Sequence, residues 1–277
     1  MHQDFTKLSH FNGYTSDLAG CWQMTDHDVL NQQEILKQGC KRGVPAQEAW
    51  LLQVEDNCTL QLELSRDGGV TNWEVTGSWL LLLDRVNVRV VNGDLPIRSL
   101  RLEVLSKLLV FIDEARNTGV FETDCPPWSP LQLHDVSIWE DRKRCEYWFL
   151  QQMLAPEPEF RNLLALLRLS ESYWLVRFLL AQSTCNNTLQ ELGQRYGVSY
   201  SHFRRLCRHA LGSAAKAELR DWRMARSLLD VVEGQENLTQ VAIKHGYASS
   251  SHFSNEIREL LGVSPRGLSN IIQLASK

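Results

Sequence analysis

Residues 199–212 read SYSHFRRLCRHALG, and fifty positions later residues 249–262 read SSSHFSNEIRELLG. The triplet Ser-His-Phe and the pair Leu-Gly hold the same places in both segments. Each segment opens with a serine, a preferred helix N-cap, and closes with a glycine, a preferred helix stop. The repeat therefore predicts two helices of equal length on a shared scaffold.

A shorter helix is predicted before each of these segments. In the first copy, Thr188 caps the helix LQELGQRY, and Gly197-Val198 forms the turn. Apolar residues are spaced to clamp the two short helices at a steep angle. These are Leu189, Leu192, Val198, Phe203 and Leu206 in the first copy, and Leu238, Val241, Ala242, Tyr247, Phe253 and Ile257 in the second. This layout is typical of a helix-turn-helix, whose second helix enters the major groove of DNA.

The segment between the copies, residues 214–232, contains neither glycine nor proline and is predicted to form one helix. Nineteen helical residues span about 28 Å, and successive major grooves on one side of DNA lie about 34 Å apart. Such a rod suits two recognition helices in adjacent grooves of one asymmetric site. Its apolar face is expected to hold Leu219, Trp222, Ala225, Leu229 and Val232.

Upstream of the repeat, the hydrophobic pattern is that of strands. The runs WLLQV, CTLQLELS, GSWLLLLD and VNVRVVNG lie between residues 48 and 101. Residues 102–119 and 137–154 then have helical spacing, a Pro-containing loop is expected at residues 125–130, and a third helix begins near Pro158.

The predicted fold class is α+β: a small β-rich, barrel-like N-terminal domain with helices, followed by an all-α domain of two helix-turn-helix units joined by a long linker helix. We place a poorly patterned segment at residues 1–45. The β-rich regulatory domain, with helices for dimerisation or partner docking, follows at residues 46–160. The double helix-turn-helix domain occupies residues 165–277.

The charge distribution favours an anionic partner for the C-terminal part. Residues 1–170 hold 16 Lys and Arg against 24 Asp and Glu, whereas residues 171–277 hold 13 against 9. The seven cysteines lack CxxC spacing and predict reduced thiols. The longest apolar run, residues 79–83, is too short to cross a bilayer. The polar start MHQDFTKLSH lacks the core of a signal peptide. We therefore expect a cytoplasmic protein that does not bind membranes.

The sequence offers no sign of catalysis. A cupin-like enzyme needs closely spaced histidine ligands, and residues 48–101 contain no histidine. We find no nucleophile-base pair and no phosphate loop. His202 and His252 have no further ligands within helical reach. We therefore expect no catalytic residues, no metal and no cofactor, and the chain is not predicted to be an enzyme.

Residues 246–268, GYASSSHFSNEIRELLGVSPRGL, resemble the signature of the AraC/XylS family of transcription regulators. The matching positions are Gly246-Tyr247, Phe253 and Gly262-Val263-Ser264-Pro265. A narrower resemblance, to invasion-gene activators of type III secretion systems, covers about residues 100–275. It is carried by RLEVLSKLLVFID, WEDRKRCEYWFLQQ, SESYWLV, GVSYSHFRRLC and LSNIIQLA. The resemblance implies an activator of effector and translocator genes that recruits RNA polymerase and has a type III secretion chaperone as co-activator.

Matching the family's recognition helices position by position implies which residues face promoter DNA. Arg204 or Arg205 suits a bidentate contact to guanine, while Arg208 suits phosphate. The second helix departs from the family pattern, with short serines and with Asn255 where arginine is common. The first helix is therefore expected to dominate base readout, although phosphate anchoring alone remains open for its arginines. The positions are Ser201, Arg204, Arg205 and Arg208, then Ser250, Ser251, His252, Asn255 and Arg258.

Two triggers for the regulator remain open. Family members often carry a small barrel that binds a small molecule or a regulatory protein. The alternating residues Leu60, Leu62, Leu64 and Val86, Val88, Val90 predict an aliphatic interior with few polar groups to orient a ligand. This favours a protein trigger, and a small-molecule-responsive regulator of a metabolic operon is the alternative. The helices at residues 102–115 and 138–154 suit homodimerisation or partner docking, or they pack on the barrel.

Overall fold

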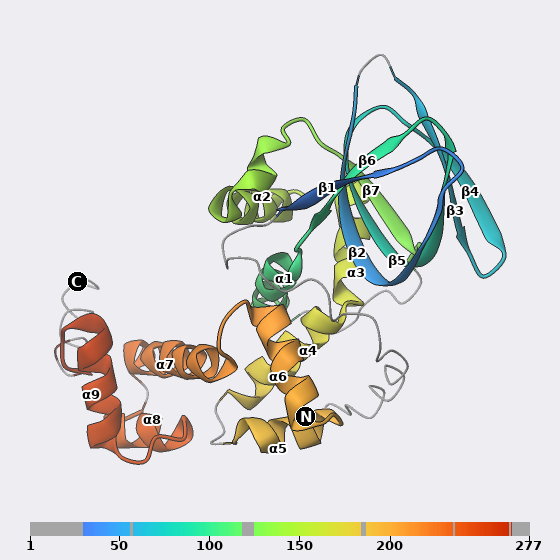
Figure 1. Ribbon diagram of the computed structural model, residues 1–277. Helices are drawn as coiled ribbons and strands as arrows, with labels where there is room; N and C mark the ends of the chain where they lie inside the picture. Colours follow the sequence, from blue (N-terminus) through green and yellow to red (C-terminus); the bar gives the residue numbers. More distant parts are fainter. Residues whose placement is uncertain are drawn as a thin grey trace. The chain divides into compact units, whose positions relative to one another are not determined.

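The computed structural model describes residues 30–55, 58–117, 125–183, 187–234, 236–265 and 267 (Figure 1). The chain divides into two compact units between Trp174 and Leu175, within helix α4 (Glu171–Gln182). The limits predicted from the sequence, 1–45, 46–160 and 165–277, stay a prediction. None of the described helices combines the length and the apolar character that a bilayer crossing requires.

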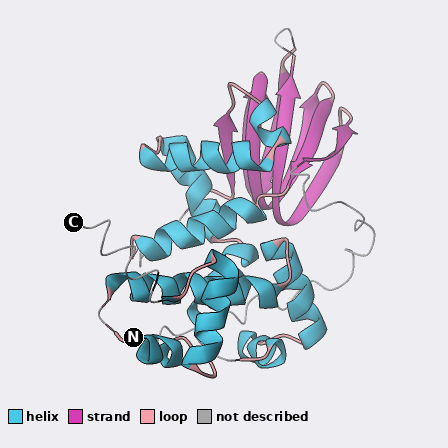
Figure 2. Cartoon of the chain, turned by 90° about the vertical axis from the view of Figure 1, so that its left-hand side faces the viewer, coloured by secondary structure: helices cyan, strands magenta, loops and turns pink. Residues whose placement is uncertain are grey.

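The first unit contains an antiparallel sheet, seven-stranded within the described residues (Figure 2). The strands pair in the order β1-β6-β2-β5-β3-β4, and β7 pairs with β5. Their bounds are β1 (Leu30–Leu36), β2 (Lys41–Val54), β3 (Leu60–Arg66), β4 (Gly69–Val75), β5 (Gly77–Asn92), β6 (Leu95–Leu100) and β7 (Trp128–Gln132). Strand β1 and the start of β2 thus lie in the segment where the sequence showed little pattern.

Strand β5 is the central element of this sheet. The sequence predicted two strands here, at residues 77–84 and 86–93, and this was wrong because one strand runs through both. Leu80 to Leu83 are all buried, since β5 is covered on its outer side by helix α3 (Pro158–Arg168), whereas residues 86–90 alternate between buried and exposed. The change falls at Arg85, whose φ is +52°, next to a register shift in β2.

The loop predicted at residues 125–130 is also wrong over its last three residues, which begin β7. This strand pairs with β5 from Trp79↔Gln132 to Leu83↔Trp128. Pro130 is tolerated because proline can occupy short edge strands, where its missing N–H costs no ladder bond. The pairing is long-range and leaves no local signal in the sequence.

The concave side of the sheet is filled with apolar side chains. All six alternating residues named from the sequence are buried, and Trp50, Leu52 and Ile97 join them. The predicted aliphatic interior is therefore confirmed.

The helices of this unit are α1 (Glu103–Ala115), α2 (Arg142–Leu154) and α3, followed by the start of α4. The segment 137–154 begins with a 3-10 turn, after which the Asp141 side chain accepts a hydrogen bond from the Arg144 N–H and caps α2. One face of α2 buries Cys145, Phe149 and Met153. The other leaves three large side chains exposed, Tyr147, Leu150 and Leu154.

A buried ion pair joins these helices. Arg168 donates to both carboxylate oxygens of Asp113 at 2.8 Å each, and the Tyr173 hydroxyl donates to Asp113 Oδ2 at 2.8 Å. The Asp113 side chain is only 3% exposed. A buried carboxylate is tolerated only when it is paired and hydrogen-bonded, as it is here, so Asp113 fixes α1 against α3 and α4.

We expect Asp113→Ala to lower the free energy of unfolding of the first unit by about 3 kcal/mol, because it deprives a largely buried guanidinium of its counter-charge. Tryptophan fluorescence in a urea titration measures this, since seven of the nine tryptophans lie between residues 50 and 174. Glu114→Ala, one residue further along α1 at an exposed position, is the control. Equal midpoints for the two variants would contradict the prediction.

The second unit is helical in its described part. After the end of α4 come α5 (Leu189–Tyr196), α6 (Tyr200–Leu211), α7 (Ala215–Glu233), α8 (Leu238–Lys244) and α9 (Ser250–Leu261). The predicted caps are confirmed: Thr188 and Ser199 cap α5 and α6, and Gly197, Gly212 and Gly262 take the left-handed conformation that ends a helix.

The linker helix α7 forms as predicted, but its predicted apolar face is wrong. Leu229 and Val232 are 61% and 46% exposed, whereas Trp222 is buried. The buried residues further along are Met224, Ser227 and Val231. Because Met224 lies about 200° around the helix from Trp222, the two halves of α7 bury different faces. A single amphipathic stripe does not describe a helix whose two ends pack against different partners.

Candidate nucleic-acid interface

The first helix-turn-helix is held by α5, the turn and α6. Thr188 and Glu191 form a capping box at the start of α5, and the hydrogen bonds from the Thr188 backbone and hydroxyl lower the pKa of the Glu191 carboxyl. Phe203 of α6 is fully buried beside the Tyr196 ring, with ring centroids 5.8 Å apart. A Cβ at Gly193 would lie 3.2 Å from the Phe203 Cβ, so this glycine permits the close approach of α5 to α6.

The second helix-turn-helix repeats this construction. Asn237 and Gln240 form its capping box, and Ser249 caps α9. Phe253 is fully buried against the Tyr247 ring, with ring centroids 4.7 Å apart. The Arg223 guanidinium lies 4.9 Å from the centroid of the same Tyr247 ring. The apolar cluster of this copy includes Met224 and Val231 from α7, so the linker helix is part of its core.

The face of α6 that the buried side chains leave outward carries the residues named from the sequence. Phe203, Cys207, Ala210 and Leu211 point inward. Ser201, Arg204, Arg205 and Arg208 are all exposed. Three guanidinium groups therefore lie on one outward surface, where they can donate to phosphate oxygens or to guanine.

Two further residues of α6, which were not among the predicted DNA-contact residues, contact these arginines. The Arg204 guanidinium lies 5.7 Å from the ring of Tyr200, and Arg205 Nη2 lies 2.7 Å from His202 Nδ1. Their spacings of four and three residues bring side chains together on a helix surface. The same spacing in the sequence could have indicated these two contacts.

The corresponding face of α9 is chemically different. Ser251, His252, Asn255 and Arg258 are exposed, and Ser250 is half-buried. His252 lies at the edge of the Tyr247 ring, 5.9 Å between centroids. Arg258 repeats Arg208 at an offset of fifty residues. This face therefore offers one guanidinium and several short hydrogen-bonding groups.

An acidic residue of α7 fastens the turn of the second copy. Asp230 Oδ2 lies 2.6 Å from His245 Nε2 and 2.9 Å from Lys244 Nζ. Burial works to raise the pKa of Asp230, but the hydrogen bonds from His245 and Lys244 outweigh it and lower the pKa below its ordinary value of 3.8. The contact ties the end of α8 to the linker helix.

We expect Asp230→Asn to destabilise the second copy by about 1 kcal/mol at neutral pH, because the charge-assisted hydrogen bonds are weakened. A carboxyl whose pKa is lower in the folded state stabilises the fold above its unfolded pKa and loses that effect as the pH falls. The difference in thermal midpoint between wild type and variant, followed by circular dichroism, is therefore expected at pH 7 and not at pH 3. Asp221→Asn, on an exposed part of α7, is the control.

Among the described cysteines, Cys145 and Cys207 are buried, whereas Cys40 and Cys58 are exposed. Burial raises the pKa of both the Cys145 and the Cys207 thiol to about 12. At Cys145 the negative charge of Glu146 adds a smaller upward effect. Cys207 thus serves the core behind α6 as a small apolar residue.

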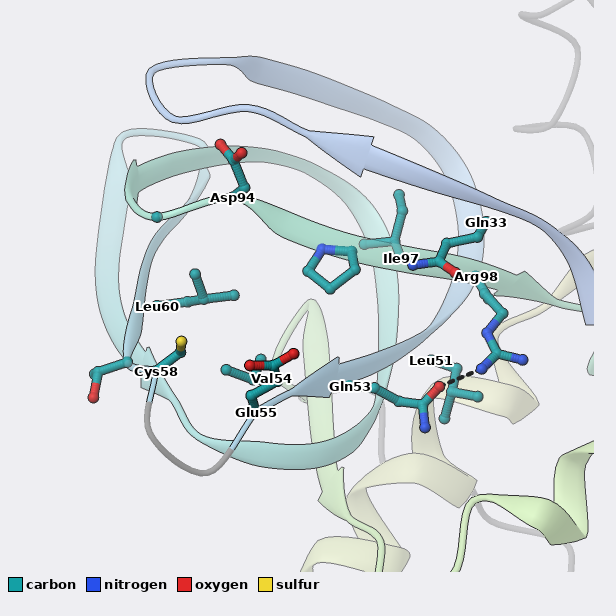
Figure 3. A pocket seen from close by; sticks show the side chains of 13 residues that line it. Gln33, Leu51, Gln53, Val54, Glu55, Cys58, Leu60, Asp94, Ile97 and Arg98 are labelled. Carbon is teal, nitrogen blue, oxygen red and sulfur yellow. Dashed lines mark hydrogen bonds between the residues drawn. The ribbon is translucent and has the colours of Figure 1, made fainter.

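The first unit has a pocket of about 570 Å³ beside strands β2 and β6 (Figure 3). Gln53 and Arg98 lie on its wall and are hydrogen-bonded to each other. Glu55, Cys58 and Asp94 supply further polar atoms, and Leu60 and Ile97 an apolar part. Leu60 and Ile97 also belong to the apolar core of the sheet, so the pocket borders that core.

These features define a class of protein: a chain with two helix-turn-helix copies that present unlike exposed helices. A helix-turn-helix domain family matches residues 192–270. The invasion protein InvF of Salmonella typhimurium is 61% identical over 198 residues, which is 72% of this chain and 92% of that protein. The transcriptional regulator MxiE of Shigella flexneri is 43% identical over 130 residues, 46% of this chain and 62% of that protein.

The chain belongs to the AraC-type family of transcription regulators that includes InvF. It is a DNA-binding transcription activator. Among solved structures, ToxT of Vibrio cholerae aligns at 10% identity over 87% of this chain and 97% of that chain, with a TM-score of 0.31, which is too low to add to this assignment.

Proposed function

We propose that this chain activates genes of a type III secretion system from the bacterial cytoplasm, reading promoter DNA chiefly through α6. The observation that carries the proposal is the outward surface of α6, with Arg204, Arg205 and Arg208 exposed on a helix whose opposite side is buried. The identity with InvF supports the class of target genes. The family resemblance supports recruitment of RNA polymerase.

The proposed DNA-contact residues divide by chemistry. Arg204 and Arg205 read bases, with Ser201 beside them, and Arg208 and Arg258 hold phosphates. In α9, the short groups donate to or accept from the DNA at close range: Ser250, Ser251, His252 and Asn255. Asn255 pairs with adenine where the groove is near enough, since an asparagine amide matches the adenine edge.

We expect Arg204→Ala or Arg205→Ala to weaken binding to the specific site by about 1–3 kcal/mol and to change binding to random duplex much less. Both side chains are exposed, so the thermal midpoint should stay within about 1 °C of wild type. The loss in binding is measured by fluorescence anisotropy, with a duplex that the wild-type chain selects from a random pool. Equal losses on both duplexes would assign these arginines to phosphates.

A secretion chaperone is the proposed co-activator, and we place its docking surface on α2. Tyr147, Leu150 and Leu154 are 64%, 43% and 83% exposed. Their spacing of three and four residues puts them on one side of the helix, opposite the buried Cys145. An exposed apolar row of this kind is typical of a helix that binds a protein partner.

We expect the double variant Leu150→Ser and Leu154→Ser to lose most chaperone-dependent transcription in vitro while DNA binding without chaperone is unchanged. The apolar area removed is outside the core, so folding should be retained. Gln151→Ser, on the same exposed surface, removes no apolar side chain and is the control. A variant that loses self-association instead would assign the surface to a homodimer.

The pocket beside β2 and β6 favours one second candidate, activation by a small molecule. Arg98, Gln53 and Asp94 provide the few polar groups that orient a ligand. If a chaperone is the trigger, Arg98→Ala leaves transcription unchanged. If a metabolite is the trigger, the variant abolishes the response to that metabolite. Transcription assayed with and without chaperone therefore separates the two candidates.

A further inference from the structure

Two pairs of side chains occupy the outward face of α6. Arg204 lies over Tyr200, and Arg205 Nη2 lies 2.7 Å from His202 Nδ1. Tyr200 is 46% exposed and His202 is half-buried, so both pairs belong to the surface. Each pair places an arginine side chain against an aromatic ring of the same helix.

The chemistry of the second pair fixes the state of the histidine. A guanidinium has only N–H donors, so His202 Nδ1 must accept the hydrogen bond. The imidazole is therefore neutral in this contact and carries its proton on Nε2. A second proton would remove the acceptor and place two cations side by side.

The repeat shows that this pair is not a property of the scaffold. At an offset of fifty residues, His252 holds the place of His202, but Asn255 replaces Arg205 and Ser254 replaces Arg204. His252 contacts the Tyr247 ring instead. Both copies therefore have the histidine, but only the first copy has an arginine three residues further on that can contact it.

We propose that His202 is the positioning residue for DNA readout by α6: its imidazole Nδ1 accepts from the Arg205 guanidinium and holds it in the orientation that pairs with a base. This rests on the proposed role of Arg205 in base contact. Binding normally immobilises a flexible arginine at an entropic cost, and a side chain that is already oriented avoids part of that cost. The first copy therefore gains affinity for its specific site without a further contact to DNA.

The test uses the full chain, the duplex that the wild-type chain selects from a random pool, and a scrambled duplex. At pH 7.5 we expect His202→Leu to weaken binding to the selected duplex about 3- to 10-fold, the factor expected when one long side chain must be immobilised on binding. Binding to the scrambled duplex is expected to stay the same. His202→Asn keeps an acceptor near Nδ1 and should retain most of the affinity.

Double variants decide the outcome. Since His202 acts through Arg205, adding His202→Leu to Arg205→Ala should cost no further affinity. Additive losses would overturn the positioning role while leaving base readout by Arg205 intact. If Arg205→Ala alone leaves specific binding unchanged, the base contact and the positioning role both fail. Circular dichroism of each variant checks that α6 is folded, and His202→Asn carries the test if His202→Leu is not.

Discussion

The burial of one phenylalanine in each recognition helix determines what that helix can present to DNA. Phe203 and Phe253 are both fully buried, each beside a tyrosine of its own copy. An α-helix turns about 100° per residue, so fixing Phe203 and Cys207 inward leaves Arg204, Arg205 and Arg208 outward. No other rotation of α6 buries its apolar residues. The exposed chemistry therefore follows from the core, not from any preference of the arginines themselves.

The linker helix extends the same constraint to both copies. Its second half supplies Met224 and Val231 to the core of the second copy, and Arg226 donates to the Leu180 carbonyl oxygen and to Ser183 Oγ at the end of α4. Asp230 then holds His245 in the turn. Because packing continues along α7 rather than stopping at each end, the helix is a structural part of the DNA-binding unit and not a tether.

The parts of this structure that local chemistry determines were predictable from the sequence. Thr188, Ser199 and Gly212 cap or end their helices as expected, because a cap depends on a few adjacent residues. Strand β7 was missed because its pairing with β5 joins residues about fifty positions apart. The buried face of α7 was mistaken because the choice depends on which neighbours each half meets. The repeat in the sequence was enough to predict which positions of α6 are exposed. The contacts of Arg204 with Tyr200 and of Arg205 with His202 depend on side-chain geometry, which the sequence does not give.

The difference between the copies gives binding a direction. A symmetric dimer on a palindrome has the same free energy in either orientation, since the same surface meets each half-site. Here the arginine-bearing α6 and the serine-bearing α9 sit on one covalent chain, so reversing the protein on a site exchanges long cationic contacts for short polar ones. With the DNA contacts proposed for α6 and α9, the reverse orientation is disfavoured, since each mismatched base pair costs about 1–3 kcal/mol. Orientation on the site is then set by a duplicated fold with diverged surfaces, within a single chain and without a symmetric partner.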